Sequence, residues 1–155
     1  MANLDQIDRQ LLAELQEEGR ITNVELAQRV GLTAPPCLRR VRALEEDGII
    51  RGYHAELDAS KLGFTITVFA MVSLKSQAEE SLRAFETAMH DLPEVREVHM
   101  LNGEIDFILK IVSRDLQSFQ EFLTSKLTPA PNVASVKTSL TIRTSKYEPG
   151  VPLEV

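Results

Sequence analysis

The sequence contains a single cysteine, Cys37, among 155 residues. One cysteine cannot form an internal disulfide, so the chain is not a disulfide-stabilised scaffold, and its free thiol fits a reducing cytosol. Histidine is also scarce, with only the scattered His54, His90 and His99. A structural zinc site needs about four clustered cysteine or histidine ligands. We therefore expect no metal site.

Long apolar runs are missing as well. No segment approaches the roughly 18–20 apolar residues that span a bilayer, so we expect no contact with a membrane. The N-terminus, MANLDQIDRQ, has no cationic region followed by an apolar core, and so it does not look like a secretory signal. Apolar residues make up 43% of the chain and charged residues 26%, which is ordinary for a soluble globular protein. A cytoplasmic location follows as the expectation.

Sequence motifs typical of enzymes are not found either. The chain has no Gly-rich phosphate loop, no metal-ligand spacing and no convincing Ser/His/Asp set. Cys37 could serve as a redox sensor, but its position on an apolar helix stripe favours a small core residue. We expect no catalytic residue and no cofactor, and we interpret the chain as a non-enzyme. A small enzyme is an alternative with no positive support.

Positive charge is scarce overall but concentrated in one place. The chain carries 23 acidic residues against 17 Lys and Arg, a net charge of −6, which argues weakly against a nucleic-acid partner. From Gly31 to Leu44, however, there are three arginines and no acidic residue. Net charge is a poor guide when charge is segregated, so this segment needs a local interpretation.

Three helices are predicted in the N-terminal third, over 5–18, 24–30 and 33–47. Apolar residues recur at spacings of three and four, as Leu4, Ile7, Leu11 and Leu15 do in the first segment. In the second segment the expected apolar stripe is Val24, Ala27 and Val30. The expected N-caps are Asp5, Asn23 and Thr33. Gly31 ends the second helix, because glycine adopts the left-handed conformation without steric cost.

The third segment has the features of a DNA-reading helix. Cys37, Val41 and Leu44 form its buried stripe, Arg39 points away, and Arg40 and Arg42 leave on either side. Pro35 and Pro36 fall in the first turn, where a missing N–H is tolerated. Two short helices joined by a glycine turn resemble a helix-turn-helix, and 49–57 should be a strand leading out of it. A cationic face of this kind fits the major groove. The alternative is a solvated face paired with Glu45 or Glu46.

From about residue 58 the pattern becomes β-α-β-β-α-β, which is the ferredoxin-like order. The expected strands are 64–74, 95–101, 105–112 and 133–142, and the expected helices are 76–92 and 115–127. Ser76 and Glu79 match a capping box, and Asn102-Gly103 matches a two-residue hairpin turn. The fold class is therefore α+β: an N-terminal, winged-helix-like helix-turn-helix domain followed by a ferredoxin-like βαββαβ sandwich.

The sequence closely resembles the Lrp/AsnC, or feast/famine, transcription regulators. The resemblance covers Leu4 to Lys146. Its motifs are Leu-Asp-x-x-Asp at the start, Cys-Leu-x-Arg-Val in the third helix, Gly-x-Ile-x-Gly-Tyr after it, and Asn-Gly-Glu-Ile-Asp in the second half. It implies a helix-turn-helix DNA-binding domain over 1–53, a linker over 54–62, an amino-acid-sensing and oligomerisation domain over 63–144, and a tail over 145–155. The tail is expected to be extended and ordered by packing on a partner.

The resemblance also implies partners and site residues. The partners are double-stranded DNA and an amino-acid effector of unknown identity, bound by homodimers that assemble into octamers. The residues expected to bind DNA are Asn23, Thr33, Pro35, Pro36, Arg39, Arg40 and Arg42. The residues expected to bind the effector are Asn102, Gly103, Glu104, Asp106 and Thr138.

Two departures from the family pattern matter. Positions 33–36 are Thr-Ala-Pro-Pro, where the family commonly has Ser-Pro and a small polar residue, so one hydroxyl contact to DNA is missing. Asn102 stands where the family commonly has threonine or serine, which leaves the effector open. The alternative function is an amino-acid-sensing oligomeric module that does not bind DNA directly.

Overall fold

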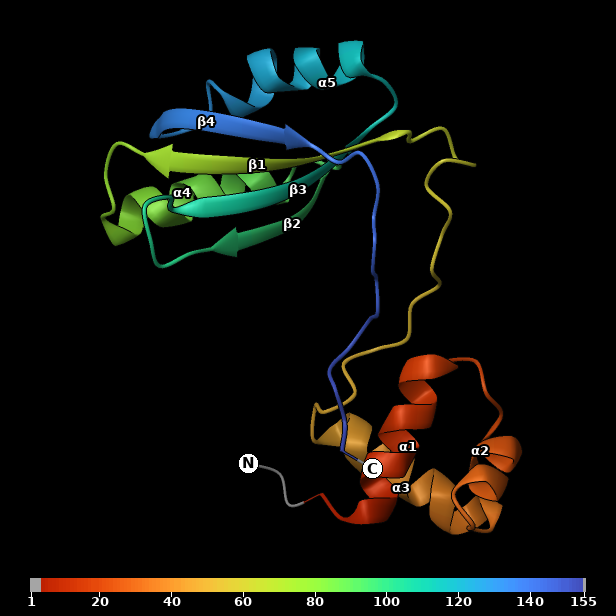
Figure 1. The fold of residues 1–155 in the computed structure, drawn as a ribbon. Coiled ribbons are helices and arrows are strands. Elements are labelled where there is room, and N and C mark those ends of the chain that lie inside the picture. Colours follow the sequence, from red (N-terminus) through yellow and green to blue (C-terminus); the bar gives the residue numbers. More distant parts are fainter. Residues whose placement is uncertain (1–3, 155) are drawn as a thin grey trace. The chain divides into compact units, whose positions relative to one another are not determined.

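The computed structural model describes residues 4–154. The chain divides into two compact units (Figure 1). The first comprises the described residues up to Glu56 together with those from Lys146 onward, and the second comprises Leu57–Ser145. No helix among the described residues has the length and apolar character needed to cross a membrane. No cluster of three or more potential metal ligands is found within residues 4–154.

The first unit contains the three predicted helices, α1 (Gln6–Glu17), α2 (Asn23–Arg29) and α3 (Ala34–Glu46). They enclose a small core formed by Leu11, Leu26, Ala27, Cys37 and Val41. The predicted stripe of α2 is wrong in part, because Val24 is 57% exposed whereas Leu26 is buried. The buried stripe of α3, with Cys37, Val41 and Leu44, is confirmed.

The helix starts differ from one another in how they are capped. At α1 the prediction is confirmed: the Asp5 side chain accepts a hydrogen bond from Asp8 N, and the Asp8 side chain accepts one from Asp5 N. At α2 the predicted cap is wrong. Thr22 is the N-cap and forms a capping box with Glu25, because these two residues have the Thr-x-x-Glu spacing that the box requires. Gly31 follows α2 with φ of +72°, as predicted.

The segments outside the helices of this unit have no regular structure. The strand predicted over 49–57 is wrong, because no strand is assigned there and the described sheet offers it no partner. The tail residues from Lys146 to Glu154 also form no helix or strand, as expected. The tail is anchored to the chain's own α1: Gln16 Nε2 donates to the Val151 carbonyl at 3.0 Å, and Val151 N donates to Gln16 Oε1 at 2.8 Å.

The second unit has the predicted βαββαβ order. Its elements are β1 (Ile66–Leu74), α4 (Glu79–His90), β2 (Val95–Met100), β3 (Phe107–Ser113), α5 (Leu116–Phe122) with a π-helical turn over Leu123–Leu127, and β4 (Val133–Leu140). The strands lie side by side in the order β2-β3-β1-β4 (Figure 1). Each neighbouring pair is antiparallel, which places β1 and β3 at the centre of the sheet.

Both α-helices of this unit, α4 and α5, pack on the same face of the sheet. Alternate residues of β1 (Val68, Ala70, Val72) are buried, and they lie opposite Ile111, Leu109 and Phe107 of β3. Phe85 of α4 contacts Phe107, with ring centroids 4.9 Å apart. Phe119 and Phe122 of α5 belong to the same core. The predicted capping box at Ser76 is wrong: the Ser76 hydroxyl accepts from Ala78 N, and α4 starts later, with Ala78 as its N-cap.

Candidate nucleic-acid interface and effector loop

The outward face of α3 carries two of the three arginines that the sequence predicts to bind DNA. Arg39 and Arg42 are exposed, and neither has an ion-pair partner among residues 4–154. Together with Pro35, Leu38, Ala43 and Glu46 they line a surface depression of about 360 Å³. Leu38 is 38% exposed and contributes an apolar contact to this surface. The surface therefore offers two free guanidinium groups around an apolar patch.

Arg40 is placed differently from its two neighbours. Its Nη1 donates to Asp5 Oδ2 and to Asp8 Oδ1, each at 2.7 Å. These bonds raise the pKa of Arg40, and the hydrogen bonds from Asp8 N and from Arg40 lower the pKa of Asp5. The predicted alternative partners, Glu45 and Glu46, are not the ones used. Arg40 ties α3 to the first turn of α1, and this ion pair competes with a phosphate contact.

The remaining residues expected to bind DNA lie at the start of α2 and α3. Thr33 is the N-cap of α3, but its side chain makes no capping hydrogen bond, and the residue is exposed. Pro35 and Pro36 occupy the first turn, as predicted. The Asn23 side-chain amide donates to the Ala34 carbonyl at 2.8 Å, which joins the beginnings of the two helices. The Thr33 hydroxyl is thus open for a contact, whereas the Asn23 amide already has one.

After α3, Tyr53 is held against the helix-turn-helix. Its hydroxyl donates to Glu45 Oε1 at 2.9 Å. Burial and this hydrogen bond raise the pKa of Tyr53 to about 12, so the phenol stays protonated. The contact also occupies one of the acids that follow the arginines. Sequence reasoning missed this role because no spacing rule links a residue after the helix to a particular acid on it.

Most of the residues predicted to bind the effector lie in the connection between β2 and β3, which we call the effector loop. The strands end at Met100 and begin again at Phe107, so the connection spans residues 101–106 and is longer than predicted. The predicted two-residue turn needs positive φ at both central positions. Asn132 is the only described non-glycine residue with positive φ, and Gly103 is not among the glycines that have it. The predicted antiparallel hairpin of the two strands is confirmed, but a tight two-residue turn at Asn102-Gly103 is wrong.

Asp106 closes this loop and is not simply solvated. Its carboxylate accepts from Leu74 N at 2.7 Å, and its own N–H donates to the Val72 carbonyl at 3.0 Å. Leu101 N donates to the Asp106 carbonyl at 2.8 Å. One carboxylate oxygen is therefore committed to the end of β1. The other oxygen is the one that could meet a ligand.

The rest of the loop is open. Asn102, Gly103 and Glu104 are exposed, and a β-carbon at Gly103 would meet no atom within 4 Å. Neither backbone strain nor crowding within the chain requires glycine at this position. A glycine at position 103 would instead allow a ligand or a second chain to approach the backbone closely.

Thr138 does not join the loop within one chain. It lies on β4 opposite Ala70, whereas the loop joins β2 and β3 on the other side of β1. Neighbouring strands are about 4.8 Å apart, so two strand spacings, about 10 Å, separate Thr138 from β3. A site that uses both needs a large ligand or a second chain.

Two family models match the chain along most of its length. A winged helix-turn-helix DNA-binding model matches residues 4–51, and the Lrp/AsnC ligand-binding domain model matches residues 67–151. Among curated proteins, the leucine-responsive regulatory protein of Rhizobium meliloti is 55% identical over 143 residues, which are 92% of each chain. The Bkd operon transcriptional regulator of Pseudomonas aeruginosa is 40% identical over 99% of this chain and 100% of its own.

Solved structures agree with this grouping. A transcriptional regulator of Neisseria meningitidis, solved in complex with L-methionine, superposes with a TM-score of 0.92 at 34% identity and covers 97% of both chains. An AsnC family regulator of Agrobacterium tumefaciens gives a TM-score of 0.90 at 32% identity, over 96% of this chain and 97% of its own.

Proposed function

The chain belongs to the Lrp/AsnC family of transcriptional regulators, and we propose that it reads duplex DNA with α3 and binds its amino-acid effector at the loop between β2 and β3. The observation that supports DNA binding by α3 is the exposed pair Arg39 and Arg42. These are the α3 arginines without an ion-pair partner in the described chain, on the face opposite the buried stripe. DNA as the partner also supports a cytoplasmic location.

The two arginines have different roles in this proposal. Arg39, which points straight out, contacts a base edge, worth about 1–3 kcal/mol of discrimination if it is bidentate to guanine. Arg42 contacts phosphate. In a two-fold dimer the half-sites should be separated by about 10 base pairs or a multiple of that spacing.

The test is DNA affinity and sequence selectivity of Arg39→Ala. Genome-wide footprinting of the parent first supplies the operator. Arg39→Ala should bind a random duplex as the parent does, apart from a small charge effect, and lose selectivity at one base pair. Arg83→Ala, on α4 of the other unit, removes the same charge as a control. If Arg39→Ala kept the full sequence selectivity of the parent, the proposed contact between Arg39 and a base would be contradicted.

The proposal of an effector site is supported by the open loop between β2 and β3. A zwitterion needs donors for its carboxylate and an acceptor for its ammonium group. Gly103 can present a backbone N–H without obstruction, and the second oxygen of Asp106 can accept from an ammonium. Asn102, Glu104 and a Thr138 from a neighbouring chain could complete the set. The L-methionine in the Neisseria meningitidis relative supports an amino acid as the chemical class.

Calorimetry against a panel of amino acids tests the loop. Asp106→Asn keeps an oxygen for Leu74 N but removes the charge, so it should weaken binding while preserving the fold. Gly103→Val fills the open space and should weaken it further. Full affinity in both variants would place the effector elsewhere.

We also propose that the sheet face not covered by α4 and α5 forms the dimer, and that dimers associate into larger assemblies such as octamers. The centre of this face is apolar, with Phe69 37% exposed and with Met71 and Ile108 beside it. The alternative, a sensing module without DNA binding, is disfavoured by the helix-turn-helix match over residues 4–51. If the protein showed no salt-dependent DNA binding, this alternative would be favoured instead.

A further inference from the structure

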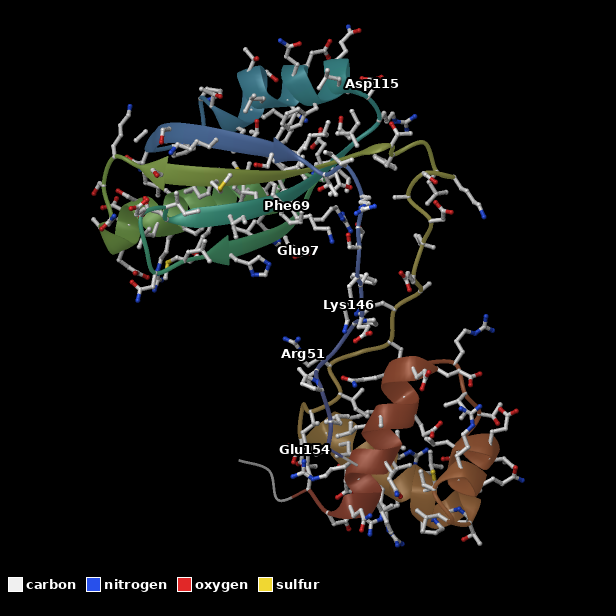
Figure 2. The ribbon with its side chains drawn as sticks, in the orientation of Figure 1. Arg51, Phe69, Glu97, Asp115, Lys146 and Glu154 are labelled. Carbon is white, nitrogen blue, oxygen red and sulfur yellow. The ribbon has the colours of Figure 1, made fainter. Side chains whose placement is uncertain are left out.

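A cavity of about 300 Å³ lies in the second unit where β3 ends and α5 begins. It is lined by Phe64, Pro93, Glu94, Val112, Ser113, Arg114 and Ser118. Figure 2 labels Asp115, the N-cap of α5, which directly follows the cavity residue Arg114. The effector loop precedes β3, so this cavity lies at the opposite end of that strand.

Glu94 presents an unsatisfied acceptor here. Its Oε1 accepts from Lys126 Nζ at 2.6 Å. Its Oε2 is the one buried side-chain oxygen or nitrogen in the described chain without a hydrogen-bond partner. Burial alone would raise the pKa of Glu94, but the hydrogen bond and charge of Lys126 and a backbone hydrogen bond together outweigh it and the pKa is lowered, so the group is a carboxylate at neutral pH. A buried carboxylate oxygen without a donor costs free energy, which a donor group of a ligand would recover.

Arg114 supplies the opposite charge. Its guanidinium lies over the Phe64 ring, 5.5 Å from the centroid. No hydrogen bond or ion pair joins it to a carboxylate within residues 4–154. Its influence on the neighbouring Asp115, whose pKa it helps to lower, is through space and secondary to the hydrogen bonds from Ser118. This cation–π contact uses none of the guanidinium N–H donors, so they can still bind a carboxylate in bidentate fashion.

We propose that this cavity is a second small-molecule site, which binds a zwitterion that carries a primary ammonium group, a carboxylate and an apolar body. The ammonium group donates to the Glu94 carboxylate, the ligand carboxylate accepts from Arg114, and the apolar part lies against Phe64, Pro93 and Val112. A cavity of about 300 Å³ is at the small end of ligand sites, which fits a molecule the size of an amino acid.

The pairing of charges argues against simpler ligands. An anion that reached Arg114 would approach the Glu94 carboxylate, and a cation that reached Glu94 would approach Arg114 and Lys126. A ligand with both charges satisfies each group, and its own charges cancel. The site is therefore expected to select zwitterions over amines and over carboxylates.

The experiment is calorimetric titration of the full-length protein with alanine, valine, leucine and methionine, and with butylamine and butyrate as singly charged probes. At least one of the four amino acids should bind the cavity, and more tightly than either singly charged probe. Glu94→Gln should weaken this binding by about tenfold or more, as expected for loss of one charge-assisted hydrogen bond. Arg114→Gln should weaken it similarly.

Two control variants distinguish binding in the cavity from a general effect of the lost ion pair and from binding at the effector loop. Lys126→Gln breaks the same ion pair as Glu94→Gln but leaves the carboxylate, so binding should persist. Gly103→Val obstructs the effector loop and should leave the cavity site intact, so failure of the loop proposal and failure of this one give different patterns. Binding that is unchanged in both Glu94→Gln and Arg114→Gln, or lost equally in Lys126→Gln, overturns the proposal.

Discussion

The three arginines of α3 share one helix but differ in what they contact. On a helical projection all three leave the buried stripe, and Arg40 and Arg42 look equivalent on either side of Arg39. The structure separates them: Asp5 and Asp8 hold Arg40, whereas Arg39 and Arg42 extend freely. Which arginine pairs with an acid depends on where α1 crosses α3, and no local pattern in the sequence gives that crossing.

This difference gives a prediction for salt dependence. Arg42→Gln should reduce the slope of log affinity against log salt concentration by about one, as expected for one lost phosphate contact. Arg40→Gln should leave the slope unchanged and lower the melting temperature instead, because it frees Asp5 and Asp8. Filter binding at several salt concentrations and thermal unfolding measure the two effects. A reduced slope in Arg40→Gln would mean that the arginine leaves its acids for DNA.

The same ion pair predicts a dependence of stability on pH. The hydrogen bond from Asp8 N, followed by that from Arg40, lowers the pKa of Asp5 below its ordinary value of 3.8 in the folded state. A lowered carboxyl pKa contributes stability that is present above the unfolded pKa and is lost as the pH falls through the folded one. Unfolding of the parent should therefore become easier below about pH 4.

Asp5→Asn is the control for this dependence, since it removes the titrating carboxyl but can still accept at the N-cap. Denaturant unfolding of both proteins between neutral pH and pH values below that transition makes the comparison. The stability difference between parent and variant should shrink in acid. A constant difference over that range would contradict the assignment to Asp5.

Cys37 provides a prediction that separates a core residue from a redox sensor. Its side chain is fully buried, and burial raises the pKa of the thiol. The thiolate is the reactive form, so the native protein should react with a thiol reagent only on unfolding. Measuring the labelling rate in native and denaturing buffer checks this. Rapid labelling in native buffer would favour the sensor.

At the scale of elements, periodicity predicted which segments are helices and strands better than it predicted where they begin and end or how they are connected. Alternating β-branched residues gave β1, and the 3–4 spacing gave α1, because burial on one face dictates both patterns. The start of α2 was misplaced, since Thr22 and Asn23 are both good caps and only the backbone decides between them. The effector loop was misjudged because Asp106 bonds to β1, a contact across 32 residues that lengthens the connection.

The contact between the C-terminal tail and α1, which the sequence did not predict, can be tested by substitution. Gly150 has φ of +86°, and a β-carbon there would collide with the Gln16 side chain that holds Val151. Gly150→Ala should therefore destabilise the first unit by about 1–3 kcal/mol, from backbone strain and loss of the anchor. Gly103→Ala is a matched control: its φ is not positive and its β-carbon meets nothing, so a change within about 0.5 kcal/mol is expected. Equal effects in denaturant unfolding would mean that the tail is not held by Gln16.

At the scale of the whole molecule, the sheet has one face that α4 and α5 do not cover. Across its centre the row Glu97, Lys110, Phe69 and Ser139 runs from β2 to β4, and Figure 2 labels Glu97 and Phe69. Lys110 Nζ donates to Glu97 Oε1 at 2.9 Å, so charge sits on one side of the aromatic ring. An apolar centre with a polar rim is the usual anatomy of a protein interface. The alternating apolar residues of β1 supply the apolar centre, but the rim depends on strand order.

This anatomy gives a prediction for assembly. Phe69→Glu places a charge at the centre of the proposed interface, and burying an unpaired charge costs more than a dimer contact of this kind can offset. The variant should be a folded monomer by light scattering at micromolar concentration, while the parent is a dimer or larger. Leu116→Glu is the control, since Leu116 is 62% exposed on α5, away from this face, and should not change the mass. Because a two-fold dimer engages two half-sites at once, loss of assembly should also weaken operator binding well beyond the effect of one charge. A Phe69→Glu protein that keeps the parent mass would move the interface to another surface.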